Sequence, residues 1–116
     1  MRREDLYLSD IIEALDHISA FTAGADFETF QESEMMRSAV VQKLAIIGEA
    51  VARLPEHLKR NHPEVPWPQI AAFRNILVHA YFGIDWEEIW RVVFRRCPAL
   101  RAQIGPILSS LRSSGE

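Results

Sequence analysis

Residues 33–54 read SEMMRSAVVQKLAIIGEAVARL, and this stretch decides the fold class. Apolar side chains recur along it every three or four residues, which is the spacing of one face of an α-helix. The stripe consists of Met36, Val40, Leu44, Ile47, Val51 and Leu54. Pro55 closes the segment, because proline has no N–H for a helical hydrogen bond and its ring clashes with the preceding turn. The sequence therefore predicts a long helix with one buried face.

The segment before this helix carries the same signal. Apolar residues at helical spacing predict a first helix, which Gly24 stops: Leu6, Ile11, Leu15, Ile18 and Phe21. A short helical piece is expected at 27–30. Beyond the long helix, four of the six prolines fall within 55–68, which predicts a rigid connection with one helical turn at 56–61.

A third helix is expected at 68–81, because Pro68 suits the first turn of a helix and Gly83 ends it. The run Asp85-Trp86-Glu87-Glu88 is typical of a helix start and predicts a fourth helix to about Cys97. Pro98 is expected to open a last helix, which Gly105-Pro106 bends. Strand signals are nearly absent. The predicted fold class is all-α, an antiparallel four- to five-helix up-and-down bundle in one domain over 1–116.

Composition excludes several classes of protein. Of the 116 residues, 48% are apolar and 25% charged, which is typical of a globular chain and not of a disordered or collagen-like one. No apolar run approaches the roughly 18–20 residues of a membrane span, and the start of the chain lacks the pattern of a signal peptide. The single cysteine, Cys97, excludes an intramolecular disulfide and a cysteine-rich zinc site. We expect a cytoplasmic protein with no metal and no other cofactor.

The charges divide unevenly along the chain. Residues 1–56 hold eleven acidic and five basic residues, whereas 57–116 hold five acidic and eight basic ones. Eleven of the thirteen basic residues are arginine, whose planar guanidinium binds phosphate in a bidentate way. The excess is consistent with phosphate binding in the C-terminal half, and equally with a genome rich in G and C.

Polar side chains that are suited to acid–base chemistry and phosphate binding lie close together in the third predicted helix, at residues 74–81, RNILVHAY. On a helical wheel Arg74, Asn75, His79 and Tyr81 lie on or beside the arc opposite the core face. An imidazole can take a proton near neutral pH, and arginine supplies a fixed cation for a phosphate. Asn75 lies one turn before His79 and can orient the imidazole or the phosphate.

The Arg74-x4-His79-x-Tyr81 pattern resembles the signature of the HepT-like toxins in the HEPN superfamily. The likeness extends over almost the whole chain, through RREDLYLSDIIEALDHI, LAIIGEAVARL, PEVPWPQIAAFRNILVHAYFGID and WEEIW in that order. The resemblance implies a HEPN-like, homodimeric, metal-independent RNA endonuclease. It implies further that a cognate nucleotidyltransferase antitoxin, MntA, neutralises it in a type VII toxin–antitoxin system by adding AMP to Tyr81.

In this interpretation His79 is the general base, Arg74 binds the scissile phosphate and Asn75 assists them. Arg74 and His79 diverge by about 140° around an α-helix, so either arginine reaches across or two copies of the helix face each other. The apolar Val78 between the polar residues favours the second arrangement. The alternative function is a non-catalytic adaptor that binds nucleotide or RNA for a partner nucleotidyltransferase.

Other residues have two interpretations each. Glu49 either forms an i,i+4 ion pair with Arg53 or lines the cleft, and Gly48 within a helix indicates close packing of a neighbouring segment. Arg91, Arg95 and Arg96 form either a solvated face, which we favour for Arg91, or an RNA track. The remaining candidates are expected to be structural: the tryptophans as core or interface, Met35-Met36 as filler, and His17, His57 and His62 without the spacing of metal ligands.

Overall fold

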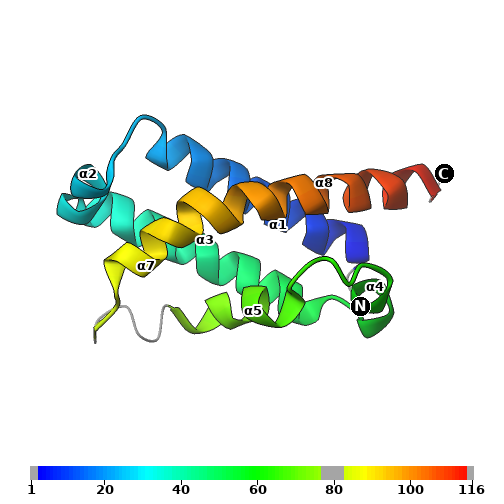
Figure 1. Ribbon diagram of the computed structural model, residues 1–116. Coiled ribbons are helices and arrows are strands. Elements are labelled where there is room, and N and C mark those ends of the chain that lie inside the picture. The colour runs from blue at the N-terminus through cyan, green and yellow to red at the C-terminus, as the bar shows by residue number, and fades with distance from the viewer. Residues whose placement is uncertain (1–2, 77–82, 115–116) are drawn as a thin grey trace.

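The computed structural model describes residues 3–76 and 83–114, and all regular elements in these ranges are helical (Figure 1). In chain order they are α1 (Glu4–Thr22), α2 (Phe27–Glu32), α3 (Glu34–Arg53), α4 (Glu56–Asn61), α5 (Trp67–Ala71), the 3₁₀ helix η1 (Ala72–Asn75), α7 (Trp86–Arg91), the π-helical turn η2 (Val92–Arg96) and α8 (Cys97–Ser114). The predicted all-α class is confirmed.

Helix α3 is the centre of the bundle. It packs against α1 on one side and against α5 and η1 on another, while α8 packs on α1. Successive long segments run in opposite directions, so the bundle is antiparallel as predicted (Figure 1). Within the described ranges, no helix combines the length and the apolar character that crossing a membrane requires.

Short polar side chains begin three of the helices. The side chain of Asp26 accepts a hydrogen bond from the backbone N–H of Thr29 at the start of α2, and Ser33 accepts one from Met36 at the start of α3. Asp85 accepts from the N–H groups of the second and third residues of α7, as its sequence predicted. These bonds satisfy N–H groups that have no partner within the helix, and so they fix where each helix begins.

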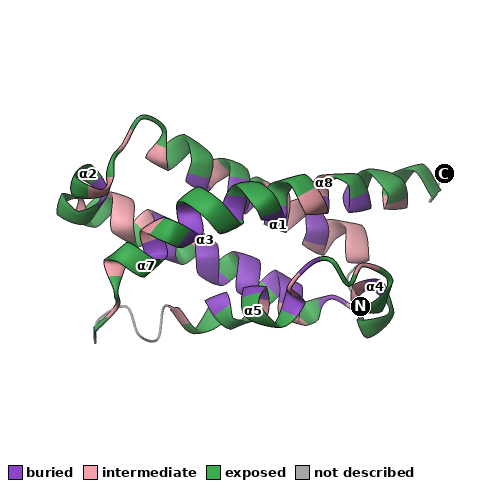
Figure 2. Cartoon of the chain, in the orientation of Figure 1, coloured by how far each residue is buried: buried purple, intermediate pink, exposed green. Residues whose placement is uncertain are grey.

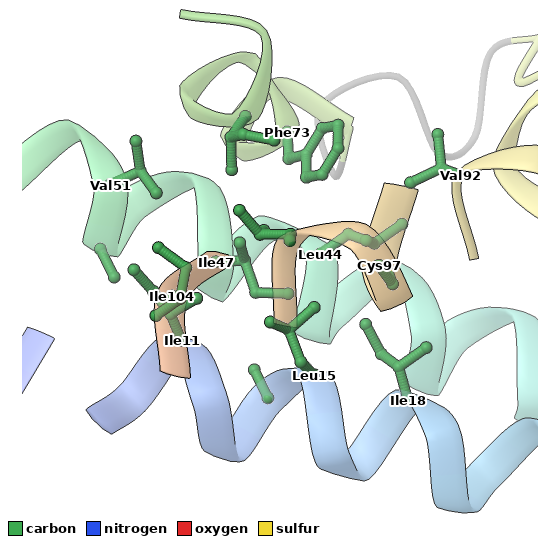
Figure 3. Packing of buried hydrophobic residues seen from close by; sticks show 14 of the residues in the cluster. Ile11, Leu15, Ile18, Leu44, Ile47, Val51, Phe73, Val92, Cys97 and Ile104 are labelled. Atoms are coloured by element: carbon green, nitrogen blue, oxygen red, sulfur yellow. The ribbon is translucent and has the colours of Figure 1, made fainter. Parts of the chain in front are cut away.

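The predicted apolar stripes form one core (Figures 2 and 3). Its fully buried members include Leu8, Ile11, Ile18, Leu44, Ile47, Val51 and Ile104. Trp67 is also buried, and its indole N–H donates to the backbone carbonyls of Lys59 and His62, which ties the proline-rich connection to α5. Phe21 departs from the predicted stripe, because its side chain is 41% exposed.

Two predicted helices differ from the structure. The segment expected to be α-helical over 68–81 begins as α5 at Trp67, tightens to a 3₁₀ helix over Ala72–Asn75, and is α-helical again at Ile76. Residues 77–82 lie outside the described ranges. A 3₁₀ helix turns about 120° per residue, so the α-helical wheel does not hold across Arg74 and Asn75.

The second difference is at Pro98, where the sequence predicted a break between two helices. Residues 86–114 instead form one continuous helical run, α7, η2 and α8. Pro98 lies in the first turn after η2 and has no N–H to donate to the carbonyl four residues earlier. The wider π turn η2 ends at Arg96, two residues before Pro98, and the helical run continues from it into α8 without a break.

Candidate functional site

The segment that carries Arg74 is seated on α3 through Gly48. A methyl group added at Gly48 would lie 2.9 Å from the carbonyl carbon of Phe73 and 3.0 Å from the carbonyl oxygen of Ala71, and it would collide with the backbone nitrogen of Arg74. Only glycine allows two backbones to approach so closely. The close packing that Gly48 predicted is therefore confirmed, and its partner is the candidate motif itself.

Arg74 and Asn75 are both exposed at the end of this anchored segment, directly after the buried Phe73. Phe73 fixes the segment from the core side, and Gly48 fixes it from α3. Within residues 3–76 and 83–114, no carboxylate pairs with the guanidinium of Arg74. A fixed cation on a firmly held backbone is suited to binding an anion such as a phosphate.

His79, Val78 and Tyr81 lie outside the described residues. The predicted general base, seam residue and modification site therefore remain predictions, as does the divergence of Arg74 from His79. Of the four predicted polar residues of this motif, the structure places Arg74 and Asn75.

Glu49 lies on the exposed side of α3, next to Gly48. Its Oε1 atom is 3.0 Å from Nε of Arg53, so the predicted i,i+4 ion pair is confirmed. The two residues also line a groove of about 360 Å³ between α1 and α3, together with Tyr7 and Asp10. Sequence reasoning missed the contribution of α1 to this groove, because Tyr7 and Asp10 are ordinary members of an amphipathic helix. Contact of Glu49 with a substrate stays a prediction.

The basic residues of the C-terminal half differ in their partners. Nη2 of Arg91 is 3.2 Å from Oε2 of Glu88 on the surface of α7, in agreement with a solvated face. Arg95 and Arg96 are exposed and have no carboxylate partner in the described part of the chain.

Aromatic residues form a cluster on the same helical run. Trp86 and Trp90 are half-buried and pack against the buried Phe30, and Phe94 packs on Trp90 with 59% of its surface exposed. Trp86 and Trp90 thus belong to the edge of the core, which is one of the two places, core or interface, that the sequence predicted for the tryptophans.

The structure also shows features that the sequence did not indicate. Met35, expected as filler, is 84% exposed on α3, whereas Met36 packs against the core. A second groove, of about 690 Å³, lies between α1 and the start of α8, and Cys97 lies in its wall. Burial raises the pKa of the Cys97 thiol to about 12, so it is a poor nucleophile at neutral pH. No group of three or more His, Cys, Asp or Glu in the described ranges could hold a metal ion.

Fold and site together define an all-helical bundle in which the η1 segment that carries Arg74 and Asn75 is seated on Gly48 of the central helix α3. Comparison with known proteins is consistent with this class. Residues 11–107 match the family model described as HepT-like, "Ribonuclease HepT-like". The chain belongs to this family.

Named relatives extend the same likeness. The chain is 42% identical over 97 residues to "Probable ribonuclease HepT" of Thermococcus cleftensis, covering 84% of this chain and 88% of the relative. Two further relatives bear the name "Putative RNase". One is from Caldanaerobacter subterraneus, 36% identical with 88% and 91% coverage, and one is from Methanocaldococcus jannaschii, 36% identical with 95% and 91% coverage. No solved structure matches the chain significantly.

Proposed function

We propose that this protein is a metal-independent RNA endonuclease, the toxin of a type VII HepT/MntA toxin–antitoxin pair. One observation carries the proposal: the family motif begins at an exposed Arg74 whose backbone is locked between Gly48 of α3 and the core. The names of the relatives, which are ribonucleases, support RNA as the substrate.

In the proposed reaction His79 removes the proton of a ribose 2′-hydroxyl. The 2′-oxygen attacks the neighbouring phosphorus, the bond to the 5′-oxygen breaks, and the leaving oxygen takes up a proton. The products are a 2′,3′-cyclic phosphate and a 5′-hydroxyl. Arg74 stabilises the negative charge of the pentacoordinate phosphorus, and Asn75 orients the imidazole or the phosphate. Glu49 lines the cleft next to this site.

Regulation is proposed to act on Tyr81. A partner nucleotidyltransferase transfers AMP from ATP to the phenol oxygen and releases pyrophosphate. The attached phosphate then competes with substrate for the guanidinium of Arg74. Mass spectrometry after co-expression with the partner should find the AMP on the peptide that contains Tyr81, and Tyr81→Phe should prevent the addition.

A homodimer is proposed as the working form, with the 68–81 segment close to the two-fold axis and Val78 as a seam residue. Two apolar side chains of α3 are also exposed, Met35 at 84% and Ile46 at 39%. Met35 and Ile46 are eleven residues apart, close to three full turns, so they share one side of α3. Burial of such side chains against a second copy would remove apolar surface from water. Light scattering of the wild type tests the homodimer, and a monomeric wild type would contradict it. The same measurement on Ile46→Glu tests whether this side of α3 takes part in the interface.

The decisive experiment is incubation of the purified chain with RNA in the presence of EDTA. His79→Ala should abolish cleavage, a loss of at least ~10²–10⁴-fold, while His57→Ala, at a surface histidine paired with Glu4, should not. Arg74→Lys should impair cleavage strongly because the bidentate fork is lost, and Arg60→Lys is its matched control at an exposed position. Binding of RNA without cleavage by the wild type would instead favour the non-catalytic adaptor.

A further inference from the structure

The π-helical turn η2 ends in two exposed basic residues, Arg95 and Arg96. Turns of this kind are rare and occur frequently at functional sites. This one ends at Arg96, which is exposed and lacks a carboxylate partner among the residues that the structure describes. Arg91, at the other end of the turn, is already paired with Glu88. Arg96 and its neighbour Arg95 are therefore available to bind an anion.

One hydrogen bond on α8 indicates which way Arg96 faces, and the burial of Val92 agrees with it. Nε2 of Gln103 donates a hydrogen bond to the backbone carbonyl of Glu64 over 3.1 Å, so this side of α8 faces the segment that leads into α5. Arg96 precedes Gln103 by seven residues, which is two turns and about 10 Å, and it therefore lies on the same side of the helix. Val92, one turn before Arg96, is buried in the same core as Phe73 of η1 (Figure 3).

Arg96 thus lies along the side of the helix that faces the α5–η1 segment, which carries Arg74 at its end. Arg95 is one residue earlier within the wider π turn, so it lies somewhat less than about 100° further round the helix, towards its outward side. The acidic side chain nearest in sequence to the Gln103 contact is Glu64, and its carboxylate already has a partner, with Oε1 3.5 Å from Nδ1 of His62. This arrangement leaves Arg96 as a cation next to the motif segment and Arg95 as a cation facing solvent.

We propose that Arg96 is a second phosphate-binding residue, which holds the backbone of single-stranded RNA beside the phosphodiester bound at Arg74. The inference rests on the proposed function, and it adds a contact that the motif does not contain. A guanidinium is suited to this role because it keeps its charge at all relevant pH values and matches the oxygens of a phosphate. Arg96 is a positioning residue here, since it binds a flanking phosphate and not the reacting atoms.

The test compares Arg96→Gln with Arg95→Gln, two variants of identical charge. Binding of a labelled single-stranded RNA oligonucleotide is measured by fluorescence anisotropy at several salt concentrations, in a His79→Ala background that prevents cleavage. The logarithm of the binding constant falls linearly with the logarithm of the salt concentration, and loss of one phosphate contact should make this slope less steep by about 0.7. We expect the less steep slope for Arg96→Gln and little change for Arg95→Gln. Arg96→Lys keeps the charge, so its slope should be near that of the protein with Arg96 intact.

Cleavage by the enzyme with His79 intact provides the second readout. On the oligonucleotide, kcat/KM of Arg96→Gln should fall about tenfold, which corresponds to about 1.4 kcal/mol. On a dinucleotide, which has no flanking phosphate, the variant should cleave as the wild type does. Circular dichroism melting curves of all variants should coincide.

Two results would overturn the inference alone: equal behaviour of Arg96→Gln and Arg95→Gln on the oligonucleotide, or an equal loss of cleavage on the dinucleotide. In both cases the wild type still cleaves RNA, so the proposed function stands. A wild-type protein that neither binds nor cleaves RNA would overturn the proposed function and the inference with it. Binding of a protein partner that requires Arg96, with RNA binding unchanged, would also contradict the inference.

Discussion

Replacing Gly48 by alanine is expected to destabilise the protein, although the same change at most helix positions stabilises it. Alanine in the middle of a helix is about 1 kcal/mol more favourable than glycine. At Gly48, however, the new methyl group meets backbone atoms of Phe73 and Ala71 at 2.9 and 3.0 Å and collides with the nitrogen of Arg74. Overpacking of this kind costs about 1–3 kcal/mol, and a rigid backbone contact belongs at the upper end of that range.

We therefore expect the free energy of unfolding of Gly48→Ala to fall by about 2 kcal/mol relative to the wild type. Urea denaturation followed by circular dichroism measures this change, and the melting temperature should drop by roughly 6–12 °C. In the proposed enzyme the rate of cleavage should also fall, because η1 must move away from α3 and takes Arg74 with it. A displacement of about 1 Å can reduce the rate on the order of 10²-fold.

Gly105→Ala is the matched control. Gly105 also lies within a long helix. Apart from its chain neighbours and the backbone of its own helix, the atom that a methyl group there would meet is Nη1 of Arg101, at 3.0 Å, the far end of a flexible side chain. Pro106 disfavours a helical conformation for a preceding residue that has a Cβ, and this offsets the gain of about 1 kcal/mol that alanine brings elsewhere in a helix. The variant should therefore have a stability close to that of the wild type. If Gly48→Ala behaved like Gly105→Ala, the close approach of η1 to α3 would be wrong, and with it the placement of Arg74.

Three further predictions concern the core and the surface. Because burial raises the pKa of Cys97 to about 12, the thiolate is scarce in the folded protein, and Ellman's reagent at about pH 8 should label it only after denaturation; rapid labelling of the native protein would contradict this burial. Ile104 is fully buried, so Ile104→Ala should lower the free energy of unfolding by about 2–5 kcal/mol, and a urea midpoint equal to that of the wild type would show that the site is not core. The surface ion pair between Asp16 and Arg101, 3.0 Å long, contributes at most about 1 kcal/mol, so Asp16→Asn should shift the melting temperature only slightly, and less in high salt.

Much of the fold could be predicted because it depends on neighbours in sequence. The stripe of α3, its end before Pro55 and the cap at Asp85 follow from side chains within one or two turns of each other. The candidate site was a prediction of the same kind, from the spacing of polar residues in RNILVHAY, and the glycine at position 48 predicted the close packing of a neighbouring segment. These are local properties of the chain, and the sequence determines them by itself.

Contacts between distant segments decided the rest. Two features depend on how distant segments pack: the backbone approach of Gly48 to Arg74, and the contact of Gln103 with the segment before α5, which orients the helical run that carries Arg96. The sequence also did not indicate the tightening of 72–75 to a 3₁₀ helix. Phe21 belongs to the predicted stripe of α1 and is nevertheless 41% exposed, since an apolar side chain is buried only where another element covers it. Periodicity shows that a helix has an apolar face, but only tertiary packing determines which part of that face meets a neighbour.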